Sequence, residues 1–182
     1  MSSTEKIVDS FPHKSLTAIV GVPTLESISV AHLELNTCAA SVHSHRGNGR
    51  LGLLALTVQP DVLDTLSSVK FEPPTNPGPH PTIPNTSTAP QITNIRRLHK
   101  EQFDEYLQYD QVDKALKSLL IPAVDEACIR CLRHKHVGYA QVTTLQMITH
   151  LCDTYGRITP NALKENDQRL HQALTPRCHL KF

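Results

Sequence analysis

Apolar residues recur along most of the chain at spacings of three and four positions, the period of one face of an α-helix. The first such stretch follows Pro23 and Thr24, which suit a helix start, and it ends at the glycines Gly47 and Gly49. Its apolar positions are Leu25, Ile28, Ala31, Leu35, Ala39 and Val42. The pattern predicts a first amphipathic helix between these boundaries.

Shorter segments on either side of this helix have a weaker period. Residues 1–20 are expected to form a polar, flexible arm, and the apolar run at its end, residues 16–22, suits either a strand or a docking segment. The apolar run over residues 51–58 is too short for its period to separate a buried helix from a strand, and we favour helix. Residues 60–67 begin with proline and predict one or two further helical turns.

The clearest boundary in the sequence is a proline-rich stretch with polar residues between its prolines. Proline has no backbone N–H to donate, and dense prolines favour extended, solvated chain. We therefore predict a linker or loop over residues 72–90. The PxxP spacings inside it also suit a partner protein with an aromatic groove.

The longest helical pattern follows this loop and runs from Gln91 to about Leu120. Between its charged positions lies one broad apolar stripe, made of Ile95, Leu98, Phe103, Tyr106, Tyr109, Val112, Leu116 and Leu119. Pro122 is expected to kink or break this helix, because its ring clashes with the preceding turn.

Three more helices are predicted after that proline. The first covers residues 123 to about 135. The second is capped by Thr143 or Thr144 and stops at Gly156, with Met147, Ile148, Leu151 and Tyr155 on one side. The third begins with a Thr-Pro pair, an N-cap followed by a first-turn proline, and covers residues 159–174.

Together these patterns predict an all-α fold, a bundle of about five to six helices interrupted by a proline-rich loop. One compact unit is expected, since 182 residues bury a single core. Its predicted parts are an arm at 1–20, an N-terminal helical part at 21–71, the loop at 72–90, a C-terminal helical part at 91–170 and a divergent tail at 171–182.

Composition narrows the classes of protein further. With 39% hydrophobic and 19% charged residues, the chain is neither strongly disordered nor fibrous. A formal net charge of +1 is too small to indicate general electrostatic binding of nucleic acid. The five cysteines are odd in number and irregularly spaced, unlike a disulfide framework, and the N-terminus has no apolar signal region. We expect a cytoplasmic protein without a membrane segment.

Gly47, Gly49 and Gly52 spell GxGxxG, a motif that cradles a pyrophosphate when it joins a buried strand to a helix. Here the residues before it are polar, and no alternation of strands and helices follows. We therefore interpret the glycines as a helix terminator and a close backbone packing contact.

Cys128, Cys131, His134 and His136 form the pattern C-x2-C-x2-H-x-H, whose side chains are zinc ligands in other proteins. One straight helix does not converge four ligands on a tetrahedral ion, so His150 or Cys152 would have to complete a site from another helix. We favour two semi-buried thiols on an amphipathic face and expect no metal.

No arrangement typical of catalysis is present, since the sequence lacks GxSxG, HExxH and P-loop motifs. We expect a protein that is not an enzyme, with no catalytic residue, no cofactor and no small-molecule substrate. Small basic clusters supply candidate nucleic-acid contacts, although solvated helix faces have the same composition; the candidates are Arg96, Arg97, Lys100, Arg130 and Arg133.

Two short motifs carry a family resemblance. The run DKAL begins at Asp113, and a Thr-rich cap at Thr143 and Thr144 precedes a helical pattern. The matching positions are Asp113, Ala115, Leu116, Ile148, Leu151, Tyr155 and Gly156. In these positions, and in the stretch GNGRLGLLAL, the chain resembles the Gag proteins of copia-type LTR retrotransposons of the kind found in diatoms and related algae.

The resemblance covers about residues 20–170 and implies a helical, capsid-like structural protein that self-associates and helps to package RNA. Ile148 stands where the family often has an aromatic residue, the usual tryptophan-bearing opening motif is missing, and the sequence after about Leu170 no longer follows the family. We therefore expect a truncated Gag-like fragment whose partner is a second copy, with RNA as a further candidate. The alternative is a helical adaptor that binds another protein.

Overall fold

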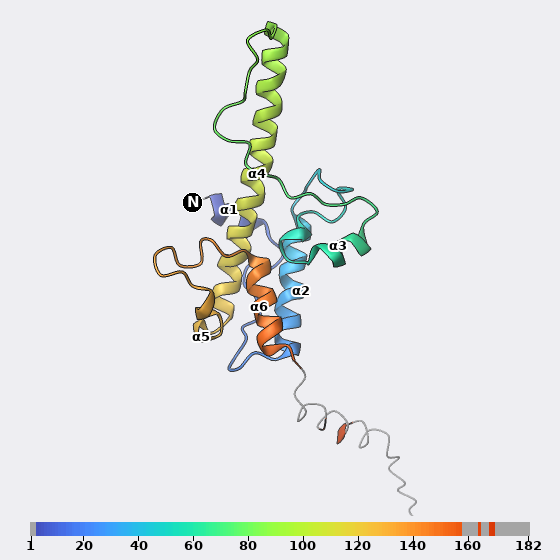
Figure 1. Ribbon diagram of the computed structural model, residues 1–182. Coiled ribbons are helices and arrows are strands. Elements are labelled where there is room, and N and C mark those ends of the chain that lie inside the picture. Colours follow the sequence, from blue (N-terminus) through green and yellow to red (C-terminus); the bar gives the residue numbers. More distant parts are fainter. Residues whose placement is uncertain (1–2, 158–163, 165–167, 170–182) are drawn as a thin grey trace, which may run out of the picture.

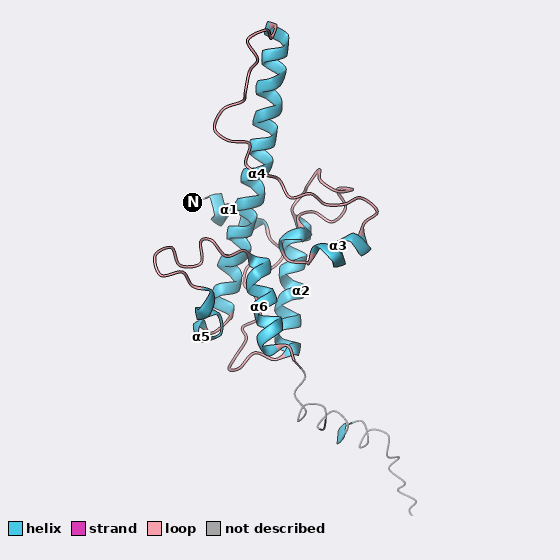
Figure 2. Cartoon of the chain, in the orientation of Figure 1, coloured by secondary structure: helices cyan, strands magenta, loops and turns pink. Residues whose placement is uncertain are grey.

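The computed structural model describes residues 3–157, 164, 168 and 169. Within these residues 58% are helical and no strand is present, which confirms the expected all-α fold (Figures 1 and 2). The predicted helix over 159–174 and the predicted tail over 171–182 lie outside the described residues, apart from single positions.

The N-terminal segment is a packed element and not a free arm, which corrects the expectation for residues 1–20. Helix α1 (Ser3–Ser10) lies beside α4, and Phe11 after it is only 2% exposed. Leu16 and Ile19 are also buried. These three apolar side chains, scattered among polar neighbours, carry the segment into the core.

Helix α2 (Leu25–Ser41) begins where it was predicted and ends earlier. At its start, the Thr24 hydroxyl accepts from the Ser27 N–H, and the Ser27 hydroxyl accepts from the Thr24 N–H, which satisfies two donors of the first turn. At its end, the Leu53 N–H donates to the Ala39 carbonyl and takes one of the helix's unpaired acceptors. The returning chain, and not Gly47, therefore terminates the helix.

The glycine loop packs closely against this end of α2. Gly52 has a φ of +54°, and a Cβ there would lie 2.4 Å from the Ala40 carbonyl oxygen. Only glycine permits this approach. The loop thus makes the close backbone packing contact that we expected of these glycines.

Two short elements follow the glycine loop. The run over 51–58 forms a single 3-10 turn, η1 (Leu54–Leu56), in place of the longer helix we favoured, and α3 (Pro60–Leu66) matches its prediction. Residues 67–88 contain no helix or strand, as the prolines predicted. This loop ends earlier than expected, because Pro90 occupies the first turn of the next helix.

Helix α4 (Ala89–Ala123) has 35 residues and is the long helix predicted, extended at both ends. At its start, the N–H and the hydroxyl of Thr88 both donate to the side-chain oxygen of Gln91. Pro122 lies in the last turn of α4, and the helix ends one residue later. The proline therefore does not break the helix before position 122. Buried residues begin only at Val112, so the N-terminal half of α4 projects from the body, with the proline-rich segment alongside it (Figure 1).

The predicted helix over 123–135 is much shorter than expected. Asp125 caps α5 (Glu126–Ile129), a 3-10 turn, η2 (Arg130–Leu132), follows, and the chain then reverses through paired backbone hydrogen bonds between His134 and Gly138. Gly138 has a φ of +58°, which the reversal requires and which a helix does not allow.

Helix α6 (Thr144–Tyr155) agrees with its prediction at both ends. Thr143 is the N-cap and pairs reciprocally with Gln146. Gly156 ends the helix by donating its N–H to the Cys152 carbonyl, and a Cβ at this glycine would lie 2.5 Å from that oxygen.

One hydrophobic core joins the parts on either side of the proline-rich loop. Its fully buried side chains come from α2, α4, α6 and α5, and include Leu35, Leu116, Leu120, Ile129, Met147 and Leu151. A small second cluster, Leu54, Val58 and Leu63, joins η1 to α3. No helix among the described residues is both long and apolar enough to cross a membrane.

Candidate functional site

The two motifs that carry the family resemblance meet in the structure. The Asp113 carboxylate on α4 accepts from the Thr144 N–H at 2.9 Å, and the Thr144 hydroxyl donates to the Asp113 carbonyl at 3.2 Å. Lys117, one helical turn along α4, lies 3.0 Å from the same carboxylate and donates to the Val142 carbonyl. This polar clamp fixes the first turn of α6 against the middle of α4.

The remaining motif positions have structural roles. Ala115, Leu116, Ile148 and Leu151 are buried in the main core, and Tyr155 packs partly buried against it. Burial of a carboxylate–ammonium pair is costly unless hydrogen bonds satisfy both groups, which the clamp achieves. The motif therefore describes how α4 and α6 are joined, and one of its positions, Ile148, also lines the apolar groove described below.

The Cys-His motif does not converge on one point. Cys128 is buried, whereas Cys131 is exposed and its sulfur lies 3.2 Å from His150 Nε2 on α6. The same His150 nitrogen donates to the Cys128 carbonyl at 3.1 Å. His134 and His136 lie on the reversal after η2, and within the described part of the chain no three potential ligands are grouped to hold a metal ion.

The candidate nucleic-acid contacts are divided between opposite ends of the molecule. Arg96, Arg97 and Lys100 are exposed near the N-terminal end of α4, while Arg130 and Arg133 lie at η2 (Figure 1). Two of these cations already have carboxylate partners, since Arg97 pairs with Glu101 and Arg133 pairs with Glu126; both distances are below 3 Å. These five residues form no continuous basic surface.

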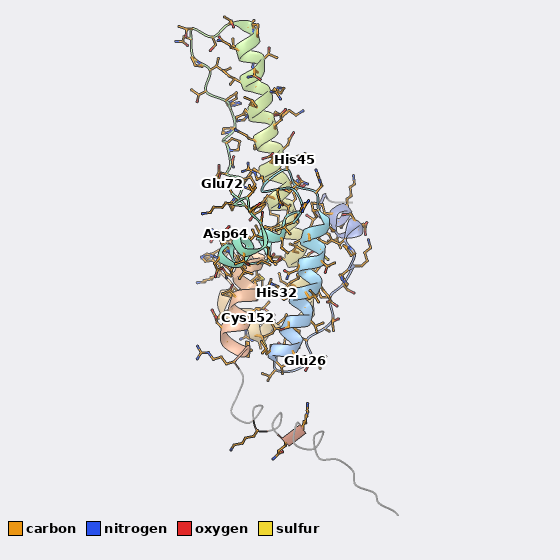
Figure 3. The ribbon with its side chains drawn as sticks, turned by 90° about the vertical axis from the view of Figure 1, so that its right-hand side faces the viewer. Glu26, His32, His45, Asp64, Glu72 and Cys152 are labelled. Atoms are coloured by element: carbon orange, nitrogen blue, oxygen red, sulfur yellow. The ribbon has the colours of Figure 1, made fainter. Side chains whose placement is uncertain are left out.

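The most distinctive surface feature is an apolar groove between α2, α3 and α6, with a volume of about 480 Å³. Its walls are mostly aliphatic, contributed by Leu54, Val58, Val62, Leu66, Leu145 and Ile148. Val62 and Leu66 of α3 remain 47% and 55% exposed beside it. Figure 3 views this side of the molecule, with His32 of α2 and Cys152 of α6 labelled.

The polar groups of the groove suit binding better than proton transfer. His32 is held by a 2.8 Å hydrogen bond from Nε2 to the Thr57 carbonyl. Burial, and then the charge of Asp153, raise the pKa of the Cys152 thiol, so that thiol stays protonated. Asn36 Oδ1 is buried in the wall without a hydrogen-bond partner. The groove therefore offers mainly apolar surface, and its one unsatisfied acceptor is buried behind the wall.

A second, more open hollow lies across α6 from the groove. It has a volume of about 690 Å³, and Gln59, Leu145, Thr149 and Asp153 line both spaces. The Gln59 amide donates to the Thr149 hydroxyl at 2.7 Å and ties the chain before α3 to the exposed face of α6. This bond holds α3 in position as one wall of the groove.

Sequence reasoning placed Ile148 in a helix core but did not find the groove. The remaining wall residues come from α2, η1, α3 and α6, and only their assembly reveals a common surface. The three apolar residues of the short α3, Val62, Leu63 and Leu66, were the available signal, because one short helix does not bury all three.

Comparisons with known proteins identified no relative of this chain. Searches against protein-family models, curated proteins and solved structures found no match to the chain.

Proposed function

We propose that this chain is a Gag-like structural protein, without enzymatic activity, that works by associating with further copies of itself. The observation that carries the proposal is the open apolar groove, whose α3 wall leaves Val62 and Leu66 about half exposed. Apolar surface of this kind on a small helical protein is typical of an interface. The helical fold and the joined motif at Asp113 and Thr144 are compatible with the Gag resemblance.

A role for RNA is the weaker part of this proposal. The two groups of candidate cations lie apart, and acidic side chains neutralise Arg97 and Arg133. RNA would therefore promote assembly by bridging several copies and not by filling one site on each copy.

Sedimentation of the purified full chain over a range of concentrations tests self-association. We expect reversible oligomers whose formation is weakened in the double variant Val62→Asp/Leu66→Asp, because two charges enter the groove wall. The control is Leu98→Asp, which alters a leucine of similar exposure on the projecting half of α4.

A strict monomer at high concentration, with and without RNA, would overturn self-association and favour the adaptor alternative. Oligomers that the groove variant leaves unchanged would show that another surface is responsible.

A further inference from the structure

A second exposed apolar feature lies at the start of α2. Val20 and Val22 are 90% and 76% exposed, the largest values among the large hydrophobic side chains of the described residues. Gly21 between them has a φ of +76°, with no atom within 4 Å of the position a Cβ would take. The chain therefore turns outward here and presents two valines to solvent. We call residues 20–22 the valine knob.

The valine knob is held at both ends. Before it, Ile19 is buried and its N–H donates to the Ala123 carbonyl at 2.8 Å. After it, Pro23 is buried and Thr24 caps α2. A short segment fixed in this way loses little conformational freedom when it docks, so its apolar contacts contribute more fully to affinity.

The knob and the groove have complementary chemistry. No backbone group of residues 20–22 makes a hydrogen bond within the described chain, so the knob presents free N–H donors between two aliphatic side chains. The groove has aliphatic walls of the same apolar character as the two valines.

We propose that the valine knob of one copy inserts into the apolar groove of the next copy. This inference rests on the proposed self-association and names the two surfaces that meet. A second copy is the occupant because the chain itself presents both halves of the contact, and its net charge of +1 opposes association only weakly.

The contact is head-to-tail, because knob and groove occupy different places on the molecule. In Figure 3, Glu26 marks the end of α2 next to the knob, and Asp64 of α3 lies toward the other end. Each copy thus donates a knob and receives another, which builds rings or open chains of copies.

Two defective variants provide the test. The knob variant is Val20→Asp/Val22→Asp, and the groove variant is Val62→Asp/Leu66→Asp. Each alone is expected to associate about 30-fold or more weakly than the wild type, the effect of losing a central interface anchor. Mixed in equal amounts, they are expected to form a one-to-one complex that grows no further, since one supplies an intact groove and the other an intact knob. Sedimentation with one of the two variants fluorescently labelled distinguishes these species.

A cross-link supplies a readout that does not depend on charge insertion. In a background carrying Cys131→Ser, Cys152→Ser and Cys178→Ser, Val20→Cys protein mixed with Leu66→Cys protein should form an intermolecular disulfide under mild oxidation by oxidised glutathione. Mass spectrometry of the linked peptides identifies the pair. The control partner is Leu98→Cys protein, on the projecting half of α4, which should cross-link to Val20→Cys only at background level.

The outcomes separate the two proposals. A wild type that never associates overturns the proposed function and this inference together. A wild type that associates while the knob variant associates equally well overturns this inference alone. Folded variants that each fail to self-associate, and fail to pair with each other, show that knob and groove are not partners and also overturn it.

Discussion

The two halves of α4 share an amphipathic pattern but differ in burial. Both carry an apolar stripe between charged residues, yet buried side chains begin only at Val112. In the projecting half, Leu98 is 44% exposed, and polar contacts tie this half to the loops beside it. His99 bonds the Gly78 carbonyl, and Arg46 pairs with Glu105 at the base of the projection.

The same contrast separates two ion pairs on this helix that have the same four-residue spacing. Arg97 and Glu101 are more than half exposed, whereas Asp113 and Lys117 have side chains only 12% and 10% exposed. Water screens the first pair, and tertiary hydrogen bonds complete the second. An amphipathic pattern therefore predicts a helix, but the partner that covers it decides what each residue contributes to stability.

The largest effect is expected when the buried pair is broken. Asp113→Ala leaves the Lys117 ammonium buried and removes the acceptor of the Thr144 N–H, so the free energy of unfolding should fall by about 3 to 5 kcal/mol. Urea denaturation measures it. Asp110→Ala is the control, because the Asp110–Lys114 pair has the same spacing and is much more exposed. Similar losses in both variants would contradict the comparison.

The loss of stability on truncating a side chain of the apolar stripe should also depend on which half of α4 is altered. Leu116 is fully buried, and Leu116→Ala should lower the free energy of unfolding by about 2 to 5 kcal/mol through lost burial and an internal cavity. Leu98→Ala should change it by about 0.5 kcal/mol or less. Thermal unfolding of the two variants gives the comparison, and a large loss at Leu98 would mean that the projecting half is covered in solution.

Tyr109 lies where the two halves meet and should make stability depend on pH. Burial, and then the charge of Asp113, raise the pKa of its phenol from 10.0 to about 12. Between these values the unfolded chain has lost the proton and the folded chain keeps it, so this contribution is complete below pH 10 and is lost as pH rises toward 12. Urea midpoints across that window should fall less steeply for Tyr109→Phe. An identical slope in both proteins would mean that Tyr109 is solvated.

The smallest effect is expected for the exposed ion pair of the projecting half. Arg97→Ala removes a solvated contact with Glu101 and should cost about 0.3 to 0.5 kcal/mol, less at high salt. Chemical denaturation at two salt concentrations measures it. A cost approaching that of Asp113→Ala would remove the distinction between the two pairs.

Much of the fold was readable from local signals, and the candidate site was not. Capping threonines, first-turn prolines and Gly156 marked helix boundaries that the structure confirms for α3 and α6. The helix over 123–135 was mispredicted because α4 continues through Ala123 and the backbone becomes extended at Val124 and again at Arg133. The groove is formed by residues of four elements. The hydrophobic period of each segment does not predict which faces remain exposed after the helices pack.

The sequence by itself determined the all-α class, the starts of the main helices and the unstructured proline-rich loop, because caps, periodicity and missing N–H donors act within a few residues. Only the tertiary structure decided that Phe11 draws the N-terminal segment into the core and that Asp113 meets Thr144. The tertiary structure also decided that the groove and the valine knob remain exposed to solvent. These features depend on contacts between distant segments, where burial and charge pairing are settled by the assembled chain.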